Sequence, residues 1–114
     1  MKQRGVHKLK LDELVHNLGL IGENKDQVSI MIKELMWKEE NGCYKPMCDL
    51  LLVHHPVFGS GHAVELKASS KYRHHAVEQL DSGCDYLHHF FNIHPSLIVR
   101  TIVYYGGGWS YENV

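Results

Sequence analysis

The segment that most constrains the fold is "LLLV" at residues 50–53, where four apolar residues follow one another. A strand with one wet face alternates apolar and polar residues, so an unbroken apolar run indicates a strand covered on both faces. A second strand-like segment, "HAVELKA" at residues 62–68, follows after a turn at residues 56–61. Strands this close in sequence are expected to pair as an antiparallel hairpin.

Helices are expected to cover this hairpin. Residues 9–18 carry apolar side chains at helical spacing, and residues 23–40 form the strongest helix candidate. A further helix is predicted from about residue 70 to 90, and the β-branched residues 97–105 predict a strand. The predicted order is helix, helix, strand, strand, helix, strand, with an optional extra strand near residues 43–45. This is the α/β class, with a mixed central sheet flanked by helices.

The composition fits one domain spanning residues 1–114. A net charge of -1 excludes a globally basic nucleic-acid binder, so any nucleic-acid surface is local or depends on metal ions. Three cysteines lack the paired spacing of a zinc site and are expected to be free thiols. The sequence contains no apolar run long enough to span a membrane and no secretory signal, so we expect a cytoplasmic protein.

Ten histidines are an unusual number, and three adjacent pairs stand at residues 54–55, 74–75 and 88–89. Neighbouring side chains on a strand or helix point in different directions, so such a pair rarely supplies two ligands to one metal. A histidine-based zinc protein is therefore kept only as an alternative, to be tested by elemental analysis.

Acidic residues interrupt the two strand segments. Asp49 directly precedes "LLLV", and Glu65 stands between Val64 and Leu66. Glu65 shares one strand face with Lys67, and the hairpin lets Asp49 approach Glu65. Two carboxylates brought together repel unless a cation lies between them, and Mg²⁺ suits oxygen ligands. The alternative is an ordinary solvated edge, on which Glu65 and Lys67 pair only with each other.

Asp49 followed by Glu65-Leu66-Lys67 resembles the split acidic motif of the PD-(D/E)xK nuclease superfamily, which includes restriction endonucleases and Holliday-junction resolvases. The resemblance covers about residues 22–105, leaving residues 1–21 as an N-terminal helical extension and 106–114 as a glycine-rich tail. The proline that this family often carries before the aspartate is replaced by Cys48. The resemblance implies a restriction-endonuclease-like core.

The resemblance also implies roles for individual residues. Asp49, Glu65 and the carbonyl of Leu66 are expected to bind Mg²⁺, for which Mn²⁺ substitutes, while Lys67 orients the attacking water. A third acid is expected from the helix before the motif. Glu23 is preferred and Glu34 is the alternative, although a glutamate at a helix start is also favourable for the helix alone. Gln79 is expected to support the site, with an ordinary polar helix position as its alternative.

Lys71, Arg73, His74 and His75 follow the motif strand and are expected to contact DNA phosphates, unless they only form a solvated helix start. The implied activity is a metal-dependent deoxyribonuclease, endonucleolytic and structure-selective in the manner of resolvases, acting as a homodimer and typical of a phage or other mobile element. The alternative is a catalytically silent DNA-binding or assembly subunit of the same fold. The preferred DNA structure stays open, as do the choice between DNA and RNA and the choice between endonuclease and exonuclease action.

Overall fold

The computed structural model describes residues 28–33, 36–54, 59–108 and 110–114. The predicted helix at residues 9–18 and the two candidate third acids, Glu23 and Glu34, lie outside these ranges. In the described part of the chain, no helix is long and apolar enough to cross a membrane.

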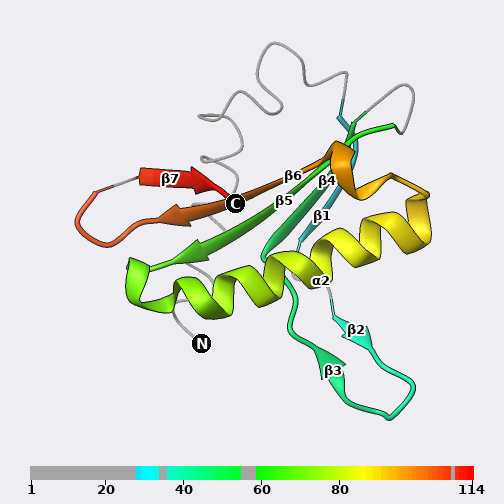
Figure 1. Cartoon of the computed structure of the whole chain (residues 1–114), viewed down its shortest axis with the longest axis horizontal. Coiled ribbons are helices and arrows are strands. Elements are labelled where there is room, and N and C mark those ends of the chain that lie inside the picture. Colours follow the sequence, from blue (N-terminus) through cyan, green and yellow to red (C-terminus); the bar gives the residue numbers. More distant parts are fainter. Residues whose placement is uncertain (1–27, 34–35, 55–58, 109) are drawn as a thin grey trace.

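A mixed five-stranded sheet forms the body of the molecule (Figure 1). Its spatial order is β1 (Val28–Lys33), β4 (Leu50–His54), β5 (Gly61–Lys67), β6 (Ile98–Tyr104) and β7 (Ser110–Asn113). Only β5 and β6 run parallel, and the other neighbours are antiparallel. The predicted β4–β5 hairpin is confirmed, and so is the predicted α/β class with a mixed sheet.

One long helix, α2 (Arg73–Phe91), connects the parallel pair and packs across β4, β5 and β6. A 3₁₀ turn, η2 (Ser70–Tyr72), precedes it, and another, η3 (Pro95–Leu97), leads into β6. The helix ends at Asn92, which adopts the left-handed conformation typical of helix ends. The predicted helix at residues 70–90 and the predicted strand at residues 97–105 are therefore confirmed.

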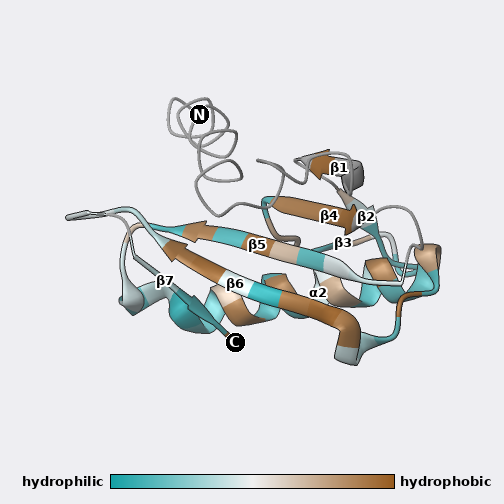
Figure 2. Ribbon diagram, turned by 90° about the horizontal axis from the view of Figure 1, so that it is seen from above, coloured by the Kyte–Doolittle hydropathy of each residue, from teal (hydrophilic) through white to brown (hydrophobic). Residues whose placement is uncertain are grey.

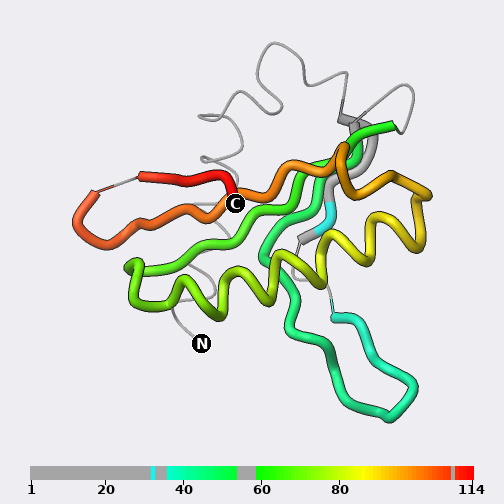
Figure 3. Tube along the Cα trace, in the orientation of Figure 1, coloured from blue at the N-terminus to red at the C-terminus, as the bar shows by residue number. Residues whose placement is uncertain are grey.

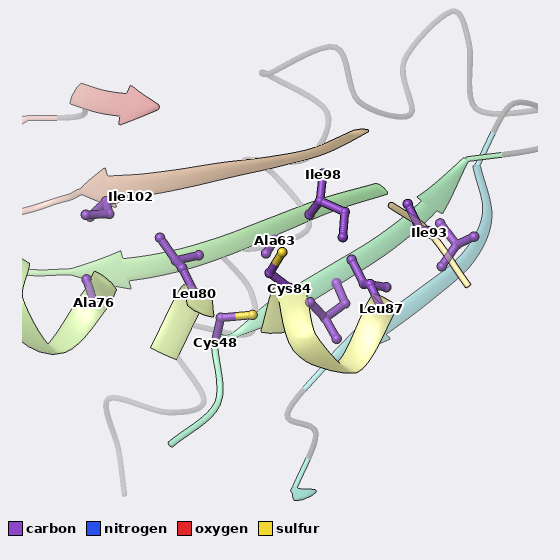
Figure 4. Close-up of a cluster of buried hydrophobic side chains, with 11 residues drawn as sticks. Cys48, Ala63, Ala76, Leu80, Cys84, Leu87, Ile93, Ile98 and Ile102 are labelled. Carbon is purple, nitrogen blue, oxygen red and sulfur yellow. The ribbon is translucent and has the colours of Figure 1, made fainter. Parts of the chain in front are cut away.

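The sheet is buried on both faces where β4 runs. Leu51 and Val53 belong to the apolar cluster beneath α2, which Figure 4 shows between helix and sheet. Leu50 and Leu52 point to the opposite face, and both are 0% exposed. Figure 2 shows β4 as apolar along its length. The interpretation of "LLLV" as a strand covered on both faces is therefore confirmed.

The helix predicted over residues 23–40 is wrong where the structure describes it. Residues 28–33, "VSIMIK", form β1, which pairs with β4 from Lys33↔Leu50 to Val28↔His54. Valine and isoleucine favour strands, and the edge of the buried strand β4 offers a hydrogen-bonding partner that an isolated segment lacks. Tertiary pairing therefore outweighed the helical spacing of the apolar residues.

The end of the predicted helix is a small hairpin instead. Here β2 (Trp37–Lys38) pairs with β3 (Tyr44–Lys45), and Asn41-Gly42 lies in the connecting turn. The optional strand near residues 43–45 is thereby confirmed. In the part of the chain that the structure describes, α2 is the one α-helix, so a sheet flanked by several helices is a wrong expectation there.

Residues 106–114 were expected to form a tail outside the core, and this expectation is wrong. Residues 110–113 form β7, which pairs with β6 from Tyr104↔Ser110 to Thr101↔Asn113. The glycine run makes the turn between them, and a Cβ on Gly106 would collide with the carbonyl of Ala68. Glycines usually end a strand pattern, so a four-residue strand behind them gives little local signal.

Candidate metal-binding site

Asp49 and Glu65 meet at the start of β4. The backbone N–H of Asp49 donates to Oε1 of Glu65 over 2.9 Å, and the N–H of Leu66 donates to Oδ2 of Asp49 over 2.9 Å. The hairpin register causes this contact, because Leu50 pairs with Val64 and the residues just beyond that pair lie opposite each other. The predicted meeting of the two acids is confirmed.

Lys67 completes the cluster. Its Nζ lies 3.2 Å from Oε2 of Glu65, as expected for two residues on the same face of β5. The Glu65 side chain is 3% exposed and that of Lys67 is 20% exposed. The lysine therefore reaches from the surface onto a buried carboxylate, and the contact is shielded from water.

Burial and charge act together on Glu65. Its pKa is raised to about 9, chiefly because burial disfavours the charged form and secondly because of the negative charge of Asp49 and a hydrogen bond with it. The ammonium of Lys67 acts in the opposite direction but does not outweigh burial. Without a cation, the Glu65 carboxyl therefore holds a proton at neutral pH. A divalent cation is the other species that satisfies such a pair.

The donor set fits a hard cation in part. Two carboxylates offer oxygen ligands, and half-buried Asp49 leaves one side of the pair open to solvent. Among the described residues, no group of three or more His, Cys, Asp or Glu is arranged to hold a metal. A complete site therefore needs further oxygen donors, such as the Leu66 carbonyl, water, substrate or the third acid predicted at residue 23 or 34.

Gln79 does not contact the carboxylates through any described hydrogen bond. Its Nε2 donates to the carbonyl of Met47 over 3.1 Å, two residues before Asp49. Its Oε1 is buried and has no hydrogen-bond partner within the described ranges. Gln79 thus ties α2 to the segment that carries Asp49.

The predicted phosphate-contacting residues lie together around the start of α2, and all four are exposed. Arg73 donates from Nε to Oε1 of Glu112 in β7 over 2.8 Å.

The other three residues, Lys71, His74 and His75, contact only nearby side chains within the residues that the structure describes. His74 lies 3.2 Å from Glu78 one helical turn on, and its ring lies 5.3 Å from that of His75. Lys71 Nζ lies 5.4 Å from the ring centre of Tyr72. The structure thus brings all four predicted phosphate-contacting residues to the start of α2, but the Arg73 guanidinium is already hydrogen-bonded to Glu112.

Tyr105 was missed in the sequence. Burial raises its pKa, and the negative charges of Asp49 and Glu65 raise it further, which places its phenol near the acidic pair. Its backbone N–H donates to the carbonyl of Lys67 over 3.0 Å, extending the parallel pairing beyond both strands. The sequence could have indicated Tyr105, because β5 carries Glu65 and Lys67 and runs parallel to β6. The residue that follows β6 therefore lies beside the end of β5.

The histidines do not assemble a zinc site in the described residues. His62 in β5 is buried, and its Nε2 lies 2.7 Å from Oγ1 of Thr101. Residues 88 and 89 lie on the last turns of α2, where His88 Nδ1 lies 3.0 Å from the carbonyl of Ile93 and His89 stacks on Trp37. These contacts favour structural roles.

Comparison of the chain with known protein families, with curated proteins and with solved structures found no match. The chemistry assigned to Asp49, Glu65 and Lys67 therefore rests on their own geometry and on no relative.

Proposed function

We propose that the protein is a Mg²⁺-dependent phosphodiesterase that hydrolyses DNA. The observation that carries the proposal is the meeting of Asp49 with Glu65 and Lys67. Asp49 lies 16 residues before Glu65 in the sequence and contacts it where the neighbouring strands β4 and β5 lie side by side. A buried glutamate beside a half-buried aspartate and a lysine is a costly arrangement for stability alone, and such groups concentrate at functional sites.

In the proposed reaction, Asp49 and Glu65 would hold the cation together with the Leu66 carbonyl. The third acid, for which Glu23 is preferred over Glu34, would complete the ligand set. When bound there, a divalent cation would supply charge that lowers the pKa of a water and offsets negative charge on the phosphate. Lys67 orients the water whose oxygen attacks phosphorus, and the bond from phosphorus to the leaving oxygen breaks. The attacking water releases a proton to solvent, and the leaving oxygen takes up a proton from solvent. Gln79 holds Met47, and through it Asp49, in place.

The substrate proposal follows the resemblance of the motif to resolvases and related nucleases. The resemblance implies an endonuclease that is selective for DNA structure. Cleavage of linear, circular, flapped and four-way DNA in Mg²⁺ or Mn²⁺ tests this choice, with RNA included as a competitor.

A second candidate is a silent DNA-binding or assembly subunit. It is favoured by the state of Glu65, whose two oxygens already accept a backbone N–H and contact Lys67 while the side chain is almost fully buried. In that case the acidic pair would keep its proton and bind no metal. Calorimetric titration with Mg²⁺ near neutral pH separates the two candidates, because only the nuclease gives a binding signal that Glu65→Gln removes.

The main test is cleavage by variants of the cluster. Asp49→Asn, Glu65→Gln and Lys67→Ala are each expected to lower the cleavage rate about a hundredfold or more, because each removes a charge at the reacting phosphate. Asp85→Asn is the matched control, since it removes one exposed carboxylate from α2 outside the cluster. Circular dichroism checks that each variant folds. Full activity in Glu65→Gln or in Glu65→Ala would sink the assignment.

A further inference from the structure

Two hydrogen-bond donors converge on one carboxylate oxygen at the end of β6. Arg73 Nε lies 2.8 Å from Oε1 of Glu112, and the Tyr104 hydroxyl donates to the same oxygen over 2.6 Å. The donors come from the start of α2 and the end of β6, and the acid comes from β7. Together, Arg73 and Tyr104 form a built anion site that the chain's own carboxylate occupies. We call this pair of donors the Arg73–Tyr104 site.

The Arg73–Tyr104 site lies on the same side of the sheet as the acidic cluster. Tyr104 packs against the apolar cluster beneath α2, and its backbone is in register with that of Lys67 on the neighbouring strand. Ile102 pairs with Glu65 on one side and with Glu112 on the other. Because adjacent strands lie about 4.8 Å apart, the backbones of Glu65 and Glu112 are separated by about 10 Å. Figure 1 shows these three strands side by side.

Another anion can replace the Glu112 carboxylate in the Arg73–Tyr104 site. The side chains of Arg73 and Glu112 are 50% and 38% exposed, and exposed ion pairs contribute little net stability. Hydrogen bonds from Tyr104 and Arg73 lower the pKa of Glu112, so it is a carboxylate at neutral pH. A phosphate is also negatively charged and accepts hydrogen bonds from the same donors as a carboxylate. A guanidinium binds phosphate at least as well as it binds carboxylate.

β7 does not depend on this contact for its place. Its ladder with β6 is intact, Asn113 Oδ1 accepts from the Thr101 hydroxyl over 2.7 Å, and Val114 N–H donates to the carbonyl of Arg100 over 2.8 Å. The Glu112 side chain is therefore free to leave the Arg73–Tyr104 site while the strand stays paired.

We propose that Arg73 and Tyr104 bind a backbone phosphate of the nucleic acid beside the scissile one, and that Glu112 occupies this site until the phosphate displaces it. The inference deepens the proposed function and rests on its nucleic-acid substrate. Glu112 thus lowers the affinity for nucleic acid, and it selects strands that present a second phosphate at this spacing from the cleaved one.

The test measures binding of fluorescein-labelled single-stranded and duplex DNA by anisotropy, in EDTA so that no cleavage occurs. Glu112→Gln keeps an acceptor for Tyr104 but removes the charge, and we expect it to tighten binding about threefold to tenfold. Arg73→Gln is expected to weaken binding about tenfold and to lower the salt dependence by about one released ion. In Arg73→Gln, adding Glu112→Gln is expected to change nothing further, because the site is lost.

The control removes a comparable charge elsewhere. Asp85→Asn removes an exposed carboxylate from α2 that is distant in the helix from Arg73, and it is expected to leave the affinity within about twofold. Three results would each overturn the inference: no gain in Glu112→Gln, an equal gain in Asp85→Asn, or a gain that survives in Arg73→Gln. Thermal unfolding of Glu112→Gln checks that β7 stays paired.

Cleavage by the same variants in Mg²⁺ separates this inference from the proposed function. Wild-type cleavage with no affinity change in Glu112→Gln leaves the nuclease standing and removes the phosphate site. The expected affinity pattern without any wild-type cleavage supports the phosphate site in a silent DNA-binding subunit.

Discussion

Glu65 is a buried acid whose protonation changes on unfolding. Its pKa is raised from an ordinary value of 4.5 to about 9 by burial and by Asp49. Between these two pH values the native state holds a proton that the unfolded state releases, so rising pH favours unfolding. We therefore expect the contribution of Glu65 to the free energy of unfolding to be complete below about pH 4.5. Above that pH it is expected to decline by up to about 1.4 kcal/mol per pH unit.

The measurement is urea unfolding of wild type and Glu65→Gln in EDTA, from about pH 5 to about pH 8. The glutamine cannot ionise, so the difference between the two free energies of unfolding isolates Glu65 from the ten histidines. Parallel pH profiles for the two proteins would contradict the prediction. In the wild type, Mg²⁺ is expected to flatten the decline if it replaces the proton.

Gly83 allows α2 to approach the sheet closely. A Cβ at this position would lie 2.6 Å from Sγ of Cys48 and 2.9 Å from Cδ2 of Leu51. Alanine favours a helix by about 1 kcal/mol over glycine, but overpacking a core costs about 1–3 kcal/mol, and the clash involves two buried neighbours. We expect Gly83→Ala to lower the free energy of unfolding by about 1–2 kcal/mol.

Asp85→Ala is the matched control, because it changes an exposed position on the same helix and is expected to shift stability by less than about 0.5 kcal/mol. Combining Gly83→Ala with Cys48→Ala removes the atom closest to the new methyl group. Cys48→Ala should therefore lower the free energy of unfolding less in the Gly83→Ala protein than in the wild type. If the stability changes of the two substitutions are strictly additive, the clash is relieved elsewhere.

At the scale of elements, the β2–β3 hairpin is held on the last turns of α2 by Trp37. The Trp37 ring centre lies 5.5 Å from that of Tyr86 and 5.8 Å from that of Phe90, and it stacks on His89 at 6.1 Å. Lys45 Nζ lies 4.0 Å from the ring centre on the neighbouring strand. Figure 3 shows the hairpin extending away from the main sheet.

An isolated two-stranded hairpin is only marginally stable, so its order depends on this docking. We expect Trp37→Ala to raise amide hydrogen exchange across residues 37–45 at least about tenfold, equal to about 1.4 kcal/mol of lost protection, while β5 and β6 stay protected. Tyr44→Ala is the control, because Tyr44 is an exposed side chain of the same hairpin. Equal exchange in both variants would show that Trp37 does not anchor it.

At the scale of the whole molecule, a resolvase-like endonuclease that cuts both strands of a DNA junction would need two acidic clusters. One chain supplies one Asp49–Glu65 pair, and exposed apolar side chains remain on several elements, among them Tyr44, Phe90 and Tyr111. We expect a homodimer, seen in sedimentation equilibrium as twice the chain mass of 13.1 kDa. A monomer that cuts both strands of a four-way junction in one binding event would contradict this expectation.

Several features follow from the sequence by itself. The β4–β5 hairpin, α2 and β6 are local patterns of apolar spacing with short connections, and each formed where it was predicted. The meeting of Asp49 with Glu65 follows as well, because a short hairpin fixes which residues lie opposite each other. Glu65 and Lys67 share a face for the same geometric reason.

Only the tertiary structure decided the rest, because those features depend on partners distant in the chain. Residues 28–33 carry apolar residues that suit a helix or a strand, and the free edge of β4 selected the strand. β7 is too short to be recognised before β6 offers it a ladder. The raised pKa of Glu65 depends on its burial and on Asp49, which lies 16 residues away in the sequence. The hydrogen bond between Arg73 and Glu112 joins residues 39 apart, and no local sequence pattern contains either relation.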